Sequence, residues 1–168
     1  PGELCHLLLT DDLDLGAGIL RVRNKPRLGW QVKTRNQRDV PLVPELVEVL
    51  RELCGGKVSG PVFRRRTWPE RLCRFDASSA AAIERELTRC VVGWEAEHAT
   101  SSGRVERLRL AGKLWRELGA VKEDRIRTEF IRVAESAGLA GHTAPRCCGT
   151  SSPPPCRRAG WIRSSATC

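Results

Sequence analysis

Apolar and polar residues alternate with two different periods along this chain. Three short runs rich in strand-favouring residues come first, at residues 19–23, 29–34 and 38–42. A Lys-Pro-Arg-Leu-Gly turn joins the first two runs. Pro41 places the third run away from the centre of a sheet, because proline has no N–H to donate to a central ladder. The pattern predicts a small three-stranded antiparallel sheet near the N-terminus.

After these runs the apolar period becomes that of an α-helix. Helices are predicted over residues 44–54, 78–99, 104–118 and 121–137, and residues 1–9 are typical of the end of a helix followed by a turn at 10–12. The fold class expected is therefore α+β, mainly α-helical. The residues expected to face the core are Leu46, Val49, Leu50 and Leu53; Ile83, Leu87, Val91 and Trp94; Leu108, Ala111, Leu114, Trp115 and Leu118; and Ile126, Phe130, Val133, Ala134 and Ala137.

The predicted strands are strongly basic. Seven Lys and Arg residues and no acid lie between Arg21 and Arg38, and the 168-residue chain has a formal net charge of +9. A basic antiparallel ribbon favours a polyanionic partner. The alternative is a solvated hairpin that happens to be basic. The triplet at residues 64–66 is also basic, and is either a solvated loop or a further contact to a nucleic-acid backbone.

The cysteines divide into two groups. Cys5, Cys54, Cys73 and Cys90 are scattered singly through helical patterns, and the other four lie in the last 22 residues. The first group is expected to be reduced core thiols of a cytoplasmic protein. No run approaches the length of a membrane span and no secretory signal opens the chain, so no membrane partner is expected. The chain has no Tyr and no Met.

Five pieces of sequence follow one another in an order that resembles the catalytic domain of tyrosine recombinases, the phage-type integrases. The match covers residues 1–63 and resumes near 126–147. The pieces are Gly2-Glu-Leu, Asp12-Leu-Asp, the basic strand with Val32-Lys-Thr and Val40-Pro-Leu, the helix at 44–54, and Gly60-Pro-Val-Phe. Residues 1–145 are accordingly expected to form a partial recombinase catalytic domain, in which residues 70–120 fit poorly and resemble an insertion.

The resemblance implies a chemistry that needs neither metal nor cofactor. In the family a tyrosine attacks a DNA phosphate to form a phosphotyrosyl link, and two arginines hold the non-bridging oxygens. By resemblance Lys33 is the general acid that protonates the departing 5′ oxygen, with Lys25 as the second choice. A plainer role for Lys33 is to neutralise a phosphate. The residues expected to bind double-stranded DNA are Arg21, Arg23, Lys25, Arg27, Arg35 and Arg38, and the parent enzyme is expected to assemble as an oligomer on DNA.

Two catalytic positions of the family have no counterpart in this chain. The first catalytic arginine stands three residues before the Glu of the Glu-Leu pair, which places it just before Pro1. The family's second arginine belongs to a Leu-Arg-His-x-Phe-Ala-Thr box, and Gly149 occupies its place here. Arg146 is a weak match to the His or Lys that precedes this box.

Residues 146–168 differ in character from the rest of the chain. They contain no acid, four Cys and three consecutive Pro, which is typical of disorder. Moving the reading frame back by one base allows Leu-Arg-His-Leu-Phe-Ala-Thr over this stretch, so it is interpreted as an out-of-frame tail. A zinc site is the alternative, but the spacing fits no common zinc motif. Its ligands would be His142, Cys147, Cys148, Cys156 and Cys168.

The sequence therefore predicts a fragment of a site-specific DNA recombinase or integrase that cannot cut DNA, because no tyrosine is present to act as nucleophile. Two alternatives remain. One is a non-catalytic DNA-binding remnant or pseudogene product, which shares the same fold. The other is an unrelated small basic α+β domain, for which changing Lys33, Arg35 and Arg38 would leave DNA affinity unchanged.

Overall fold

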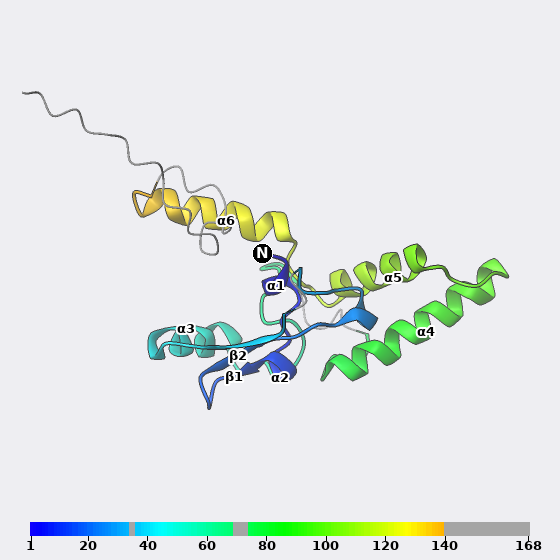
Figure 1. The fold of residues 1–168 in the computed structure, drawn as a ribbon, viewed down its shortest axis with the longest axis horizontal. Coiled ribbons are helices and arrows are strands. Elements are labelled where there is room, and N and C mark those ends of the chain that lie inside the picture. Colours follow the sequence, from blue (N-terminus) through cyan, green and yellow to red (C-terminus); the bar gives the residue numbers. More distant parts are fainter. Residues whose placement is uncertain (34–35, 69–73, 140–168) are drawn as a thin grey trace, which may run out of the picture. The chain divides into compact units, whose positions relative to one another are not determined.

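The computed structural model describes residues 1–33, 36–68 and 74–139. This part of the chain is α+β, mainly helical with a small antiparallel sheet, as predicted (Figure 1). No helix in it is both long enough and apolar enough to cross a bilayer. The elements, in order, are α1 (Gly2–Cys5), α2 (Leu9–Asp12), β1 (Leu13–Asp14), β2 (Ile19–Val22), the 3₁₀ helix η1 (Pro26–Leu28), β3 (Arg38–Pro41), α3 (Pro44–Cys54), α4 (Ala80–His98), α5 (Arg104–Glu117) and α6 (Glu123–Ser136).

The sheet has three antiparallel strands in the order β1-β2-β3, and the prediction was wrong about one of them. Leu20 pairs with Leu13 on one side and with Val40 on the other, so Leu13–Asp14 is the third strand. Residues 29–33 do not join the ladder. Pro26 starts η1, and Gly29 ends it in the left-handed region with a φ of 73°. The chain therefore turns back on itself before a second ladder can form.

The segment before the sheet is two short helices where the sequence predicted one helix end and a turn. α1 ends at Cys5, and α2 forms a single turn over the residues expected to be the turn. The Asp12 carboxylate stabilises this turn because it accepts the backbone N–H of Leu8 at 2.7 Å. Cys5 and Cys54 are buried free thiols, and burial raises the pKa of Cys5 to about 11. Cys73 lies outside the described residues.

α3 has the predicted bounds but buries a different face. Pro44 stands in its first turn and Gly55 ends it in the left-handed region. The buried side chains are Val47, Leu50 and Cys54, and Leu50 and Cys54 pack in one cluster with Leu7, Leu13 and Val62. Three of the four residues expected in the core, Leu46, Val49 and Leu53, are instead 42 to 58% exposed. The helix meets the sheet through the row of residues one position further along.

α4 and α5 form a helical pair that shares a core with the N-terminal segment (Figure 1). Ser79 caps α4 by accepting the N–H of Ala82, and the predicted Ile83, Leu87 and Val91 are buried. They pack with Trp115 and the other buried residues of α5, and the same cluster includes Leu8 and Leu28. Residues 80–118 therefore fold onto the N-terminal segment. Leu108, predicted to face inward, is 44% exposed.

The chain divides into two compact units, residues 1–126 and 127–168, and α6 begins in the first and continues into the second. Its helical pattern was predicted correctly, but its predicted core face is largely uncovered among the described residues. Ala134 is buried, whereas Phe130 and Val133 are 38% and 59% exposed. Arg146, the predicted tail and the ligands of the zinc alternative lie outside the described residues.

Candidate nucleic-acid interface

One face of the sheet carries two of the predicted DNA-binding arginines, and each is held by a carboxylate from a neighbouring strand. Arg21 lies on β2 opposite Asp39 of β3, and Arg23 follows two residues later on the same face. The Arg21 guanidinium is 3.0 Å from Asp14 of β1, and that of Arg23 is 2.5 Å from Asp39. We call this the outer face of the sheet, because the opposite face packs toward α3.

The Arg23–Asp39 pair is exposed and the Arg21–Asp14 pair is only partly buried, so both remain in contact with water and are weak. The backbone N–H of Ala17 and the guanidinium of Arg21 both lower the pKa of Asp14, so its carboxylate is charged at neutral pH. Exposed pairs of this kind contribute only about 0 to 1 kcal/mol, because water and salt screen them. An incoming phosphate oxygen can replace such a carboxylate at little cost. Asp14 and Asp39 therefore orient Arg21 and Arg23 without preventing either arginine from binding a phosphate.

Arg38 is engaged differently from Arg21 and Arg23. It stands opposite Val22 at the end of the ladder and makes two bonds to Glu3 of α1, at 3.1 and 2.7 Å. A planar guanidinium fork fits both carboxylate and phosphate in this bidentate manner. Arg38 therefore ties β3 to α1, and it can contact a phosphate only if Glu3 releases it or shares it.

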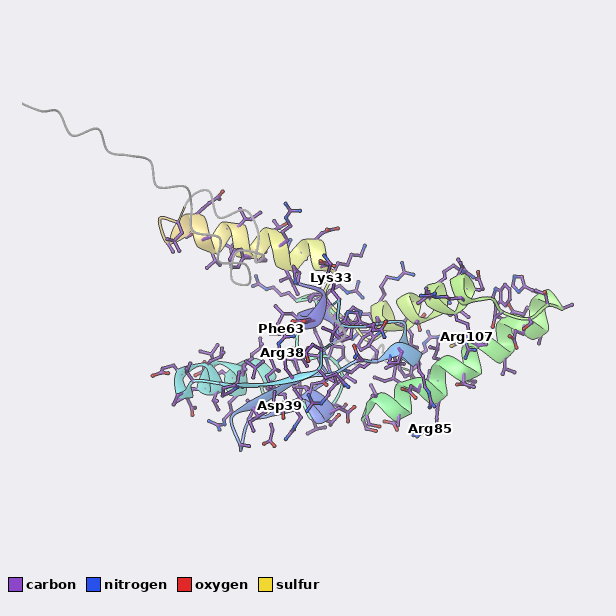
Figure 2. The ribbon with its side chains drawn as sticks, viewed as in Figure 1. Lys33, Arg38, Asp39, Phe63, Arg85 and Arg107 are labelled. Carbon is purple, nitrogen blue, oxygen red and sulfur yellow. The ribbon has the colours of Figure 1, made fainter. Side chains whose placement is uncertain are left out.

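Lys33 is exposed and lies in a turn directly after the buried Val32 (Figure 2). The N–H of Val32 donates to the side chain of Asn24 at 2.8 Å, which fixes the backbone just before Lys33. Lys33 makes no ion pair with any carboxylate of the described residues. It is therefore a cation available to a phosphate, and its role as general acid stays a prediction. Arg35 lies outside the described residues.

Lys25, by contrast, is a core residue. Its ammonium lies 2.7 Å from Asp12, both side chains are at most 5% exposed, and the Trp30 ring lies 5.8 Å away. Burial raises the pKa of Asp12, while the ammonium of Lys25 and the N–H of Leu8 oppose that rise. An ammonium held in this way is not accessible to DNA. We therefore leave Lys25 out of the proposed interface and out of the general-acid role.

The turn that carries Lys25 is clamped by aromatic side chains. Trp30 stacks on His6 with ring centroids 5.0 Å apart, and His6 meets Trp115 edge-on at 4.9 Å. The indole N–H of Trp115 donates to the carbonyl of Leu28 at 3.0 Å. Burial lowers the pKa of His6, so the imidazole is neutral at physiological pH. The turn at residues 25–30 is thus fixed to α1 through His6 and to α5 through Trp115.

At least two arginines of the basic triplet at residues 64–66 have a structural role. Arg64 donates to the carbonyls of Ser59 and Pro61. Arg65 donates to the carbonyl of Arg116 at 2.6 Å and lies over the ring of Trp68 at 5.0 Å. Guanidinium groups used in this way bind loops together, so we do not include them in the interface.

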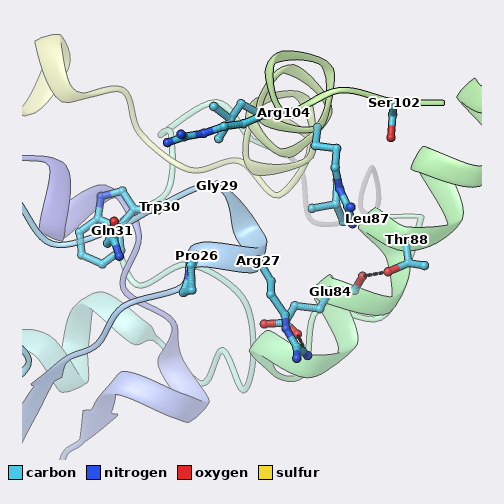
Figure 3. A pocket seen from close by; sticks show the side chains of 12 residues that line it. Pro26, Arg27, Gly29, Trp30, Gln31, Glu84, Leu87, Thr88, Ser102 and Arg104 are labelled. Carbon is cyan, nitrogen blue, oxygen red and sulfur yellow. Dashed lines mark hydrogen bonds and ion pairs between the residues drawn. The ribbon is translucent and has the colours of Figure 1, made fainter. Parts of the chain in front are cut away.

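Arg27 lines a pocket that the sequence did not predict, and its side chain extends toward Glu84 (Figure 3). Its guanidinium is 83% exposed and lies 3.5 Å from Glu84 of α4. Arg104 and Arg107 of α5 line the same pocket. The sequence analysis assigned no role to these two arginines, and nothing in the linear order indicated that they would line a pocket together with Arg27.

No family model, no curated protein and no solved structure matches this chain. The resemblance to tyrosine recombinases therefore rests on the residues and their order. The geometry adds an outer face with two arginines in weak ion pairs, an exposed lysine at position 33, and a separate arginine-lined pocket.

Proposed function

We propose that this chain is part of the catalytic domain of a tyrosine recombinase, and that it binds double-stranded DNA through the outer face of its sheet without cutting it. The order of the five sequence pieces is the observation that carries the family. The α+β architecture with an N-terminal antiparallel sheet is compatible with it. The outer-face residues of the proposal are Arg21 and Arg23. Lys33, Arg35 and Arg38 are further DNA contacts carried over from the sequence prediction.

The electrostatics of the outer face support DNA as the partner. Arg21 and Arg23 are spaced along one strand and held by exposed carboxylates, and Lys33 adds a cation with no acidic partner among the described residues. Binding to DNA replaces each carboxylate by a phosphate and releases counterions condensed on the duplex. The net gain per arginine is smaller than for an unpaired cation, because Asp14 and Asp39 remain nearby.

The chemistry of the family cannot be completed by these residues. The nucleophile must be an activated oxygen that forms the covalent link, and the chain contains no tyrosine. Gly149 stands where the family's second arginine is expected. Lys33 is the one residue proposed to keep a catalytic position, by resemblance, and a general acid without a nucleophile produces no cleavage. The proposed activity is therefore binding alone, and site-specific recombination belongs to the parent enzyme.

A duplex-DNA titration at several salt concentrations tests the binding proposal. A ribbon variant, Arg23→Gln with Lys33→Gln, is compared with a control variant, Arg85→Gln with Arg109→Gln, which removes the same charge from α4 and α5. We expect the ribbon variant to bind more weakly, by about tenfold or more, and the control to bind like the wild type. Equal affinity of wild type and ribbon variant would favour an unrelated basic α+β domain.

A suicide substrate, in which the cleaved strand end diffuses away, tests the absence of cleavage. Recombinases that form a phosphotyrosyl link accumulate a covalent protein–DNA adduct on such a substrate. We expect no adduct that survives denaturing electrophoresis, even at DNA concentrations that saturate binding. An adduct would contradict the proposal that this chain only binds DNA.

A further inference from the structure

A pocket of about 860 Å³ lies between the turn around η1, helix α4 and the first turn of α5 (Figure 3). Its size is within the range of small-molecule sites, and it is far larger than a single phosphate needs. The turn contributes Arg27 and Trp30, α4 contributes Glu84 and Leu87, and Arg104 belongs to α5. All of these residues belong to the first compact unit.

The charge in the pocket is predominantly positive. Arg27, Arg104 and Arg107 line it, and Glu84 is the one carboxylate among its lining residues. Glu84 lies 3.5 Å from Arg27, whereas Arg104 and Arg107 make no ion pair with a carboxylate of the described residues. Both stand in the first turn of α5, where the helix dipole is already positive. Hydrogen bonds from Ser102 lower the pKa of Glu95, and Arg107 is near enough to that carboxyl to help lower it. Arg104 and Arg107 nevertheless remain exposed to solvent and can still bind an anion.

The walls of the pocket provide apolar surface beside these cations. Leu87 and Leu108 come from the two helices, and Pro26 and Trp30 come from the turn. Gly29 lies so close to α5 that a Cβ added to it would approach Ala111 to 3.0 Å, so the turn is held firmly against the helix. Gln31, Thr88 and Ser102 add polar groups at the rim.

We propose that this pocket binds a nucleoside phosphate, with the phosphate on the guanidinium groups and the base against the apolar wall. Guanidinium groups recognise phosphate through charge-assisted hydrogen bonds. The apolar wall, where Leu108 is 44% exposed, suits a base, and the polar groups suit a sugar. The ligand is either a free nucleotide or the nucleotide at the end of a DNA strand. This site is separate from the outer face and does not rest on the proposed function.

Calorimetric titration with AMP tests the site in the full chain. A pocket variant, Arg104→Gln with Arg107→Gln, removes two charges from α5. It is compared with the control variant Arg85→Gln with Arg109→Gln, which removes two charges from residues that do not line the pocket, one on α4 and one on α5 (Arg85 and Arg107 are labelled in Figure 2). We expect the pocket variant to lose about tenfold or more in AMP affinity and the control to stay within about twofold of wild type. Glu84→Gln should bind AMP more tightly than wild type, because the opposing carboxylate is gone.

Three further ligands define what the pocket recognises. Inorganic phosphate and adenosine should each bind more weakly than AMP, because each lacks one half of the recognised group. A single-stranded oligonucleotide with a 5′-phosphate, compared with its 5′-hydroxyl form, separates the two sources of ligand. A tighter complex with the phosphorylated strand than with AMP identifies a strand end, and the reverse identifies a free nucleotide.

Three results would overturn the proposal. The first is the absence of AMP binding to folded wild-type protein at millimolar ligand. The second is an equal loss of affinity in the pocket and control variants, which would mean nonspecific charge attraction. The third is phosphate or adenosine binding as tightly as AMP, which would mean that no nucleoside phosphate is recognised. Circular dichroism of each variant confirms that the comparison is between folded proteins.

Discussion

The outer face of the sheet and the pocket beside α5 use arginine in opposite ways. On the outer face Arg21 and Arg23 each have a carboxylate within 3.0 Å, so much of the positive charge counted in the sequence is already offset. In the pocket Arg104 and Arg107 form no ion pair with a carboxylate of the described residues, although Arg107 is near enough to Glu95 to help lower the pKa of that carboxyl. The density of basic residues along a chain therefore does not measure the charge available to a ligand.

The largest expected effect concerns the buried pair beneath the ribbon. Lys25→Met leaves Asp12 buried without its partner, and breaking such a pair costs about 3–5 kcal/mol of unfolding free energy. Chemical denaturation measures this directly. The same experiment separates a structural Lys25 from a DNA-contacting one, because the outer-face arginines are expected to show no comparable loss.

The double variant Asp12→Asn with Lys25→Met completes this test. With both charges gone, the desolvation cost disappears with the attraction, so the double variant should be more stable than Lys25→Met alone. A double variant as unstable as the sum of the two single variants would mean that Asp12 and Lys25 act independently, contrary to the 2.7 Å contact.

Gly29→Ala should give the next largest loss of unfolding free energy, because Gly29 packs directly against α5. Its φ of 73° is unfavourable for alanine, and the new Cβ would meet Ala111 at 3.0 Å and Leu108 at 3.2 Å. We expect a loss of about 1–3 kcal/mol by thermal or chemical denaturation. Gly112→Ala is the matched control on α5, where an added Cβ meets nothing within 4 Å. It should stabilise the protein by about 0.5–1 kcal/mol.

A pH effect comes from His6, which fixes the base of the ribbon. Because burial lowers its pKa in the folded state, the unfolded chain takes up a proton first, near the ordinary value of about 6.5. The stabilisation that neutral His6 contributes is present above that pH and is lost as the pH falls toward the folded pKa. His6→Phe keeps an aromatic ring and should flatten this dependence in denaturation curves. His98→Phe, an exposed histidine stacked on Trp94, should leave it unchanged.

The smallest effect on stability should come from removing the carboxylates of the outer face. Asp14→Asn with Asp39→Asn is expected to change the unfolding free energy by less than about 1 kcal/mol for each pair. The same variant should bind duplex DNA more tightly, because Arg21 and Arg23 no longer have competing partners. Unchanged or weaker DNA binding would argue that these arginines face no phosphate.

Much of the helical fold could be predicted from local chemistry. Pro44 and Gly55 delimit α3, and Ser79 caps α4, so their limits follow from residues next to them in sequence. The buried face of each helix was harder to predict than its ends. Leu46 and Leu50 fit one helical stripe equally well, and only the position of the sheet decides that Leu50 is buried and Leu46 is not. The run at residues 29–33 has strand-favouring side chains, but the packing of Trp30 on His6 holds it in a turn.

Some features of the candidate site could likewise be predicted from the sequence, and others could not. The basic ribbon and Lys33 were visible in the linear sequence, since their charges lie close together along the chain. The pairing of Lys25 with Asp12 was not, because nothing in the linear order indicated that a basic loop residue would be buried. The pocket was also invisible, because its arginines come from positions 27, 104 and 107 and are brought together by the packing of Trp115 and Leu28.

The most direct test of this account is the salt dependence of duplex-DNA binding, measured with a blunt duplex that carries 5′-hydroxyl ends. The logarithm of the binding constant should fall with the logarithm of salt concentration, with a slope of about −0.9 for each phosphate neutralised. The account predicts a less steep slope for Arg23→Gln with Lys33→Gln, and the wild-type slope for Arg104→Gln with Arg107→Gln. A wild-type slope in the ribbon variant, or an equal loss in both variants, would contradict the outer face as the DNA interface.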